Sequence, residues 1–258
     1  MVSERYETPP PEPSADPEGP GDPTDPLPAA PAPIGVGRLD RPAVGWTEIA
    51  VGAVAYLVLQ IGLAVPLILF YRGPPPGVPL VLLAAVAALG AVGIAAAVRV
   101  RSLAALGLRR TSGRALLLGL AAGVLAWLVG RGIILGYTTL TGDHSNPQQS
   151  LAAAATGSTA NLLGLIVVGA LLVPLGEELL FRGVLFSGLR RYGLVSATIV
   201  SALVFSAAHG FNVVGVTVVL LGVINALLYN RTRSIWPAVI AHGVNNAIIF
   251  ISAAILLR

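Results

Sequence analysis

Residues 162–186 read LLGLIVVGALLVPLGEELLFRGVLF, an apolar stretch long enough to cross a lipid bilayer that nevertheless contains the adjacent glutamates Glu177 and Glu178. Apart from Asp143, these are the only carboxylates after Glu48. A charged side chain in the middle of a membrane costs about 2.5 to 3.5 kcal/mol even on insertion-based scales, so membrane proteins rarely keep one without a task. The two glutamates therefore mark the place where we expect chemistry.

The rest of the chain has the composition of a polytopic membrane protein. Of its 258 residues 55% are hydrophobic and 11% are charged, and the mean hydropathy is +0.82, which excludes a water-soluble surface. The absence of cysteine excludes disulfides, thiolate nucleophiles and cysteine-based metal sites. The arginines fall mainly in short loops, so the positive net charge does not indicate nucleic-acid binding. We expect an all-α bundle of transmembrane helices whose surroundings are the lipid bilayer.

About seven membrane spans, within a range of six to eight, are expected from the apolar runs. Arginines occur in every second loop, with five of them in residues 99–114. The positive-inside rule then places these loops and the N-terminus in the cytoplasm and the C-terminus outside, in what we expect to be a bacterial cell membrane. The expected spans are 46–71, 78–98, 115–140, 159–181, 194–209, 213–229 and 235–257.

Composition divides the chain into three parts. Residues 1–45 hold 12 of the 20 prolines and 8 of the 12 acidic residues, so we expect a disordered cytoplasmic arm. Residues 46–150 are expected to form the N-terminal transmembrane helices. Residues 151–258 are expected to form the catalytic transmembrane core.

Within the third expected span, small residues recur at a spacing of four. Gly119 with Gly123, and Gly132 with Gly136, predict close approach to neighbouring helices. Arg131 lies between these pairs, and we interpret it as a structural charge that pairs with a backbone carbonyl or reaches toward the membrane surface. This span is expected to contribute packing rather than catalysis.

Polar residues on three later spans are expected to reach a similar depth. Counted from the nearest arginine-bearing loop, Glu177 lies about 20 Å into its helix and His209 about 22 Å into the next. On the last span, His242 lies about 14 Å and Asn246 about 20 Å from the same face. Because His242 and Asn246 are four residues apart, they share one face of their helix. We therefore expect the four side chains to converge on one buried site.

The two glutamates are expected to have different roles, because neighbouring side chains on a helix point about 100° apart. Glu178 and Arg182 are four residues apart and can neutralise each other inside the bundle. Glu177 has no nearby cation in sequence and lies in a desolvated setting, which suits a general base. Phe205 and His209 share a helix face in the same way.

Three motifs in this region resemble those of the CPBP group, which comprises type II CAAX prenyl proteases of the Ras-converting enzyme type and the bacterial Abi proteins. Residues 177–183 (EELLFRG) resemble the family's EExxFRG, residues 205–209 (FSAAH) resemble FxxxH, and residues 242–246 (HGVNN) resemble HxxxN. The motifs occur in the family's order, within about residues 158–255. The resemblance implies an intramembrane endopeptidase whose partner is a membrane-associated protein or peptide substrate, prenylated or CAAX-like in eukaryotic relatives.

The resemblance also implies a role for each motif residue. Glu177 and His209 would hold and deprotonate a water molecule that attacks the scissile carbonyl group. His242 and Asn246 would stabilise the oxyanion that forms. The supporting residues would be Glu178, Arg182 and Phe205.

Two questions stay open at this point. Glu177, His209 and His242 could together bind a divalent metal such as zinc, and the family was long described as metalloproteases. We favour a metal-free mechanism without a cofactor, because Asn246 is a poor zinc ligand and the chain has no HExxH helix.

The other question is the class of function. A non-catalytic membrane scaffold or immunity protein of the same fold, and a small transporter with a carboxylate relay, would use the same residues, although a relay would line a whole path with polar groups.

Overall fold

A computed structural model describes residues 44–72, 75–100 and 103–257 of the chain. Within these residues the secondary structure is helical and includes no strand, which confirms the expected all-α fold. A helix satisfies its backbone donors and acceptors within one segment, which is the condition that a lipid interior imposes on a spanning chain. The disordered arm expected for residues 1–45 lies outside the described residues, apart from its last two positions.

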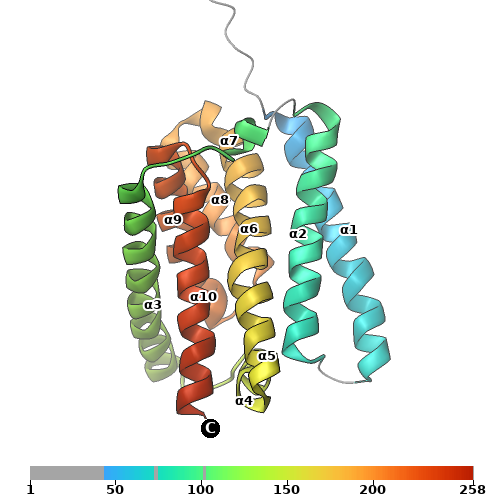
Figure 1. The fold of residues 1–258 in the computed structure, drawn as a ribbon, viewed down its shortest axis with the longest axis vertical. Helices are drawn as coiled ribbons and strands as arrows, with labels where there is room; N and C mark the ends of the chain where they lie inside the picture. The colour runs from blue at the N-terminus through green and yellow to red at the C-terminus, as the bar shows by residue number, and fades with distance from the viewer. Residues whose placement is uncertain (1–43, 73–74, 101–102, 258) are drawn as a thin grey trace, which may run out of the picture. The chain divides into compact units, whose positions relative to one another are not determined.

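Six described helical segments are long and apolar enough to cross a membrane, within the range of six to eight expected from the sequence. Figure 1 shows α1 and α2 side by side, with the C-terminus at the end of the bundle where α4 and α5 lie. The run expected at 194–209 forms α8, an apolar helix of only 15 residues. The spans are α1 (Trp46–Tyr71), α2 (Gly77–Arg99), α3 (Gly113–Thr141), the segment from α5 to η4 (Thr159–Tyr192), α9 (Val213–Thr232) and α10 (Trp236–Leu256), and α8 is Leu194–Ala208.

The fourth span carries both glutamates and changes its helical pitch along its length. In its two π-helical segments, backbone N–H groups bond to carbonyls five residues back rather than four. Two short elements lie in the loops before it, η1 (Leu103–Leu106) and α4 (Gln149–Gly157). The parts of the fourth span are α5 (Thr159–Gly164), the π-helix η2 (Leu165–Leu172), α6 (Val173–Glu178), the π-helix η3 (Leu179–Phe186), α7 (Ser187–Leu189) and the 3₁₀ turn η4 (Arg190–Tyr192).

A tight turn between α8 and α9 fixes the position of His209. Gly210 follows it with a φ of 93°, a left-handed conformation that glycine adopts without steric cost. The side-chain oxygen of Asn212 then accepts a hydrogen bond from the N–H of Val214 at 2.9 Å and caps α9. The backbone of His209 is therefore held in a fixed position at the end of α8.

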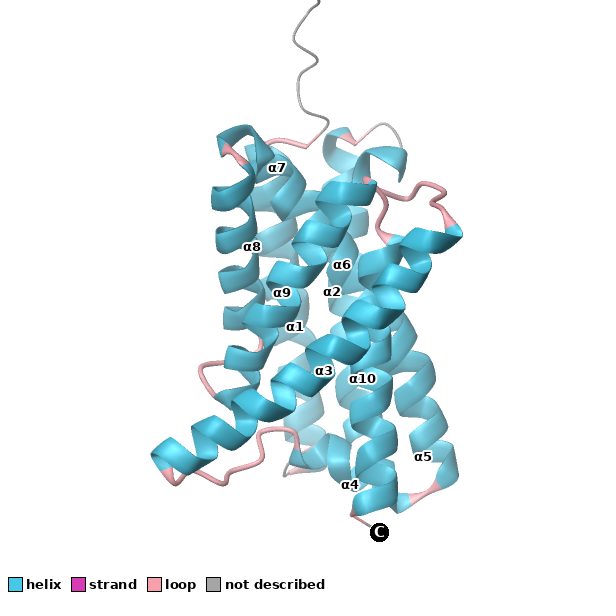
Figure 2. Ribbon diagram, turned by 90° about the vertical axis from the view of Figure 1, so that its left-hand side faces the viewer, coloured by secondary structure: helices cyan, strands magenta, loops and turns pink. Residues whose placement is uncertain are grey.

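Glycines bring the first half of α3 against α10. A Cβ atom at Gly119 or Gly123 would lie 2.4 Å from a carbonyl oxygen of α10, so any larger residue would force the helices apart. The prediction was wrong for Gly132 and Gly136, where a Cβ atom would meet no atom within 4 Å. Figure 2 shows the reason, because α3 crosses α10 obliquely and its second half leaves that neighbour.

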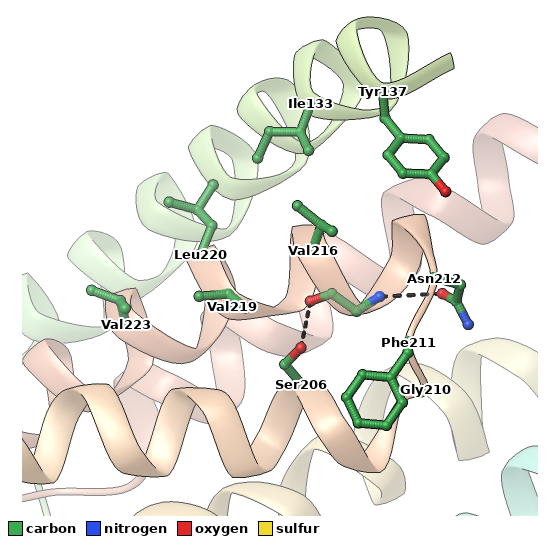
Figure 3. A pocket seen from close by; sticks show the side chains of 11 residues that line it. Ile133, Tyr137, Ser206, Gly210, Phe211, Asn212, Val216, Val219, Leu220 and Val223 are labelled. Carbon is green, nitrogen blue, oxygen red and sulfur yellow. Dashed lines mark hydrogen bonds between the residues drawn. The ribbon is translucent and has the colours of Figure 1, made fainter. Parts of the chain in front are cut away.

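Between the second half of α3 and the first half of α9 lies an apolar groove of about 700 Å³, which we call the lateral groove (Figure 3). The turn after α8 forms one end of it, and Phe211 in that turn is 99% exposed. The hydroxyl of Ser206 on α8 donates to the carbonyl oxygen of Gly215 at 2.8 Å and ties α8 to α9 beneath the groove. The other side chains that line it include Ile133, Tyr137, Val216, Val219, Leu220 and Val223.

Candidate active site

The structure brings Glu177, His209 and His242 together from three helical segments. Glu177 lies in α6, His209 directly follows α8, and His242 lies in the first half of α10. The Oε2 atom of Glu177 is 4.0 Å from Nε2 of His209 and 3.8 Å from Nε2 of His242. Glu177 and His242 are buried, whereas 24% of the His209 side chain is exposed. The convergence expected from helix depth is observed for these three side chains.

Glu178 binds three neighbours through a single carboxylate oxygen. Its Oε1 accepts hydrogen bonds from Arg182 Nη1 at 3.1 Å, from Asn225 Nδ2 at 2.9 Å and from His242 Nδ1 at 2.9 Å. A fully buried charge is tolerated where an opposite charge and hydrogen bonds compensate for lost hydration. The pairing with Arg182 agrees with the four-residue spacing. The hydrogen bond from His242 is a second contact of Glu178 that spacing alone does not reveal.

The hydrogen bonds of the two histidines determine which ring nitrogen carries a proton. Nδ1 of His209 lies 2.9 Å from the carbonyl oxygen of Phe205, which can only accept, so this Nδ1 donates. Nδ1 of His242 donates to the carboxylate of Glu178 for the same reason. In a neutral imidazole the remaining nitrogen, Nε2, is an acceptor. Both rings therefore turn toward Glu177 a nitrogen that can take up a proton.

Phe205 lies between the two histidines and the buried arginine. Its ring centroid is 4.7 Å from that of His209 and 5.7 Å from that of His242. The guanidinium carbon of Arg182 lies 4.5 Å from the Phe205 centroid, within the range of a cation–π contact. Arg182 also donates to the carbonyl oxygen of Gly222 at 3.0 Å. Phe205 and Arg182 therefore support the site by packing, and neither contacts Glu177 through a hydrogen bond among the described residues.

Asn246 donates a hydrogen bond to a backbone carbonyl of the fourth span that receives no hydrogen bond from a backbone N–H of its own helix. Its Nδ2 donates to the carbonyl oxygen of Gly169 at 3.0 Å. In the π-helix η2 that carbonyl would accept from the residue five positions on, which is Pro174 and has no N–H. The N–H of Val173 bonds to the carbonyl of Val168 instead. One Nδ2 proton of Asn246 is thus used for positioning, and the second is left for a ligand.

Two contributors to the site were missed at the sequence level. Asn225 of α9 is fully buried and donates to Glu178, and an amide inside an apolar span carries the same desolvation cost that drew attention to the glutamates. That desolvation cost could have identified Asn225 from the sequence. Gln60 of α1 lines the same cavity as Glu177. Its position there depends on how α1 packs against the other helices, which helix periodicity does not predict.

These side chains line a cavity of about 390 Å³, which we call the polar cavity. Its wall includes α1, α2 and α3 besides the later helices, so the N-terminal spans are part of the site. Arg131 of α3 lies in this wall and is exposed. Of the two roles expected for it, the hydrogen bond to a backbone carbonyl is not found among the described residues, and the reach toward the membrane surface stays a prediction. The polar residues of the wall that bear on function are Gln60, Arg131, Glu177, His209, His242 and Asn246.

The spacing of the donors does not fit a zinc ion. Two ligands that each lie about 2.0 to 2.1 Å from a tetrahedral zinc are about 3.3 Å apart. The distances from Glu177 Oε2 to His209 and His242 are 4.0 and 3.8 Å, and the described residues contain no group of three or more His, Asp or Glu arranged to hold a metal. Two hydrogen bonds of about 2.8 Å that meet at an oxygen at about 105° span roughly 4.4 Å, so one water molecule can bridge the observed separations at a narrower angle.

Comparison with known proteins agrees with this geometry. Residues 159–248 match the family model described as type II CAAX prenyl endopeptidase Rce1-like, and the matched segment contains all three sequence motifs. No curated protein and no solved structure matches the chain. The chain is therefore a membrane-spanning helical bundle whose residues 159–248 are similar to the type II CAAX prenyl endopeptidase Rce1-like family.

Proposed function

We propose that the chain is an intramembrane endopeptidase that hydrolyses a peptide bond of a membrane-associated protein or peptide with a water molecule activated by Glu177. The observation that carries the proposal is the Oε2 atom of Glu177. It is buried, has no hydrogen-bond partner among the described residues, and faces two imidazole nitrogens at 3.8 and 4.0 Å. An unpartnered buried carboxylate oxygen is costly, and a bound water is the simplest group that satisfies it.

In the proposed reaction Glu177 is the general base. A water molecule donates one hydrogen bond to Glu177 Oε2 and the other to His209 Nε2, both of which are acceptors. As the water oxygen attacks the carbonyl carbon, its proton passes to Glu177 and the carbonyl oxygen becomes an oxyanion. Glu177 then returns the proton to the amide nitrogen, the C–N bond breaks, and the products are a carboxylic acid and an amine.

His242 and Asn246 are the proposed oxyanion donors. The free Nδ2 proton of Asn246 is one donor, and a second requires His242 to carry a proton on Nε2 as well as on Nδ1.

The two parts of the chain contribute differently to this site. We propose that residues 151–258 form the catalytic core. They supply the base, the oxyanion donors and Glu178, which accepts three hydrogen bonds. Residues 46–150 supply part of the cavity wall through Gln60 and Arg131. Glu178, Arg182 and Phe205 act as positioning residues.

Substitution of the base tests the proposal. We expect purified Glu177→Gln to fold like the unaltered chain and to lose cleavage of a membrane-peptide library, whereas the control Asp143→Asn, in the exposed loop after α3, keeps it. Cleavage should survive a chelator, because no step requires a metal ion. Cleavage by Glu177→Gln at the original rate would exclude Glu177 as the base. A chain that shows no cleavage in any form, but retains partner binding, would support the scaffold alternative.

A further inference from the structure

The two ends of the helical bundle differ in charge. Arginines gather where α2 leads to α3, where η4 leads to α8 and where α9 leads to α10. At the opposite end, the sequence has only Arg72 after α1 and Arg258 after α10, and the loops after α3 and α8 contain no arginine. The positive-inside rule therefore assigns the arginine-rich end to the cytoplasm. The arginines described there are Arg109, Arg110, Arg114, Arg190, Arg191, Arg231 and Arg233.

The polar cavity extends toward the other end of the bundle. Its wall includes Pro147 and Gln148 of the loop after α3, and Leu151 of α4. Figure 1 places α4 at the same end as the C-terminus, away from α7. A second cavity of about 390 Å³, which we call the vestibule, adjoins it and is lined by residues 144–148 and by the last turn of α10. The two cavities therefore adjoin, and they share the lining residues Trp127, Arg131, Ile134, Pro147, Gln148, Leu151, Val214, Ile249 and Phe250.

Toward the arginine-rich end, the site is closed by packed side chains. Neither cavity has a lining residue from the arginine-bearing loops. Between Glu178 and the arginine-rich end, the rings of Phe186 and Tyr229 meet edge to face at 5.9 Å, and both are buried. The hydroxyl groups of Ser187 and Tyr229 lie 3.0 Å apart and complete this layer. A peptide that approached from the arginine-rich end would have to displace a packed layer of the core.

The lateral groove does not offer a second route. Thr217, Val218 and Leu221 of α9 line the polar cavity, whereas Val219 and Leu220 line the groove. The two spaces therefore lie on different faces of the same helix, and α9 separates them. Figure 3 shows the groove bounded by α3 and α9, with Phe211 at the turn. The vestibule, by contrast, adjoins the polar cavity and is lined by the loop after α3 and by the end of α10.

We propose that the polar cavity receives its substrate through the vestibule, from the side of the membrane opposite the arginine-rich loops. The substrate class is then the extracytoplasmic part of an exported or membrane-anchored protein, rather than a lipid-modified tail on the cytoplasmic face. Cleavage in this inference rests on the proposed peptidase function. The side of access rests on the charge distribution and on the cavities alone, so the two can be tested separately.

The absence of cysteine makes the side of access measurable. In the full chain, Ser145→Cys places a thiol in the vestibule loop and Thr111→Cys places one at the arginine-rich end. Intact bacterial cells that express each variant are treated with a membrane-impermeant maleimide before and after permeabilisation, with the unaltered cysteine-free chain as control. We expect complete labelling of Ser145→Cys in intact cells, and labelling of Thr111→Cys only after permeabilisation. The reverse pattern would overturn the proposal.

A third variant tests the route itself. Ala152→Cys lines the vestibule but not the polar cavity, so a bulky maleimide there should block peptide entry and abolish most cleavage. The same label on Thr111→Cys should leave the rate unchanged. Full cleavage by labelled Ala152→Cys would refute entry through the vestibule. If the unlabelled chain cleaves nothing, the peptidase proposal fails, while the labelling pattern still decides the side on which the vestibule opens.

Discussion

Replacing both members of the buried ion pair, Glu178→Leu with Arg182→Leu, separates the packing role of Glu178 from its role in holding His242. Both ionic side chains are fully buried, and their closest atoms are 3.1 Å apart. Removal of one member leaves a buried charge without its partner and costs about 3 to 5 kcal/mol. Replacement of both by apolar residues of similar volume is often neutral or stabilising. Glu178→Leu and the double variant both leave Asn225 and His242 without their acceptor, so they differ only in the uncompensated charge of Arg182. We therefore expect Glu178→Leu to unfold well below the temperature at which the double variant unfolds.

Cleavage should not recover together with stability. The double variant still lacks the carboxylate oxygen that accepts the Nδ1 proton of His242 at 2.9 Å. Without that oxygen, the imidazolium that the oxyanion requires loses its counter-charge, and the ring is free to adopt the other tautomer. Loss of an orienting carboxylate of this kind lowers turnover by about 10²-fold to 10⁴-fold.

Both quantities can be measured on the same preparations. Thermal unfolding of the two single variants, the double variant and the control Asp143→Asn in nanodiscs gives the order of stability, and peptide cleavage gives the turnover number. A folded double variant with the turnover of the unaltered chain would refute the role assigned to the Glu178–His242 hydrogen bond. A double variant no more stable than Glu178→Leu would refute the ion-pair argument.

Three further substitutions test individual contacts. Asn225→Ala removes one of the three hydrogen bonds to Glu178, a bond to a charged group worth about 1.5 to 3 kcal/mol, and should lower kcat at least about 10-fold in a chain that still folds. Pro174→Ala supplies the N–H that the π-helix lacks, which should compete with Asn246 for its carbonyl partner and lower kcat by roughly 5-fold with little change in unfolding temperature. Gly119→Leu should destabilise the α3–α10 contact by more than about 2 kcal/mol. Gly132→Ala, whose Cβ atom meets no neighbour within 4 Å, should unfold at or above the original temperature.

The location of the site could be predicted because a membrane span has few ways to place a residue. Depth follows from the count of residues, and helix faces follow from a spacing of four. These two rules were enough to bring Glu177, His209 and His242 to one point and to pair Glu178 with Arg182. The cost of polar groups in lipid supplied the reason to look there.

The features that could not be predicted depend on tertiary contacts. The depth count placed His242 about 6 Å short of Glu177, although their side chains lie 3.8 Å apart, because tilt and the π-helical turns change the rise along each span. The freed carbonyl of Gly169 is visible only once the helix is known to widen before Pro174. The glycine spacing in α3 predicted contacts for Gly132 that the oblique course of the helix removes.

The shortness of α8 has a consequence for the surrounding lipid. Its 15 residues extend about 22 Å, compared with about 30 Å for the hydrocarbon core of a typical bilayer. A helix that is too short for its bilayer thins the lipid beside it, so the headgroups dip toward the turn that carries His209 and Phe211. Such a dimple shortens the distance that a hydrolytic water molecule must travel from bulk solvent. Acyl-chain length would then control the proposed hydrolysis, with thin membranes well hydrated at this point and thick membranes dry.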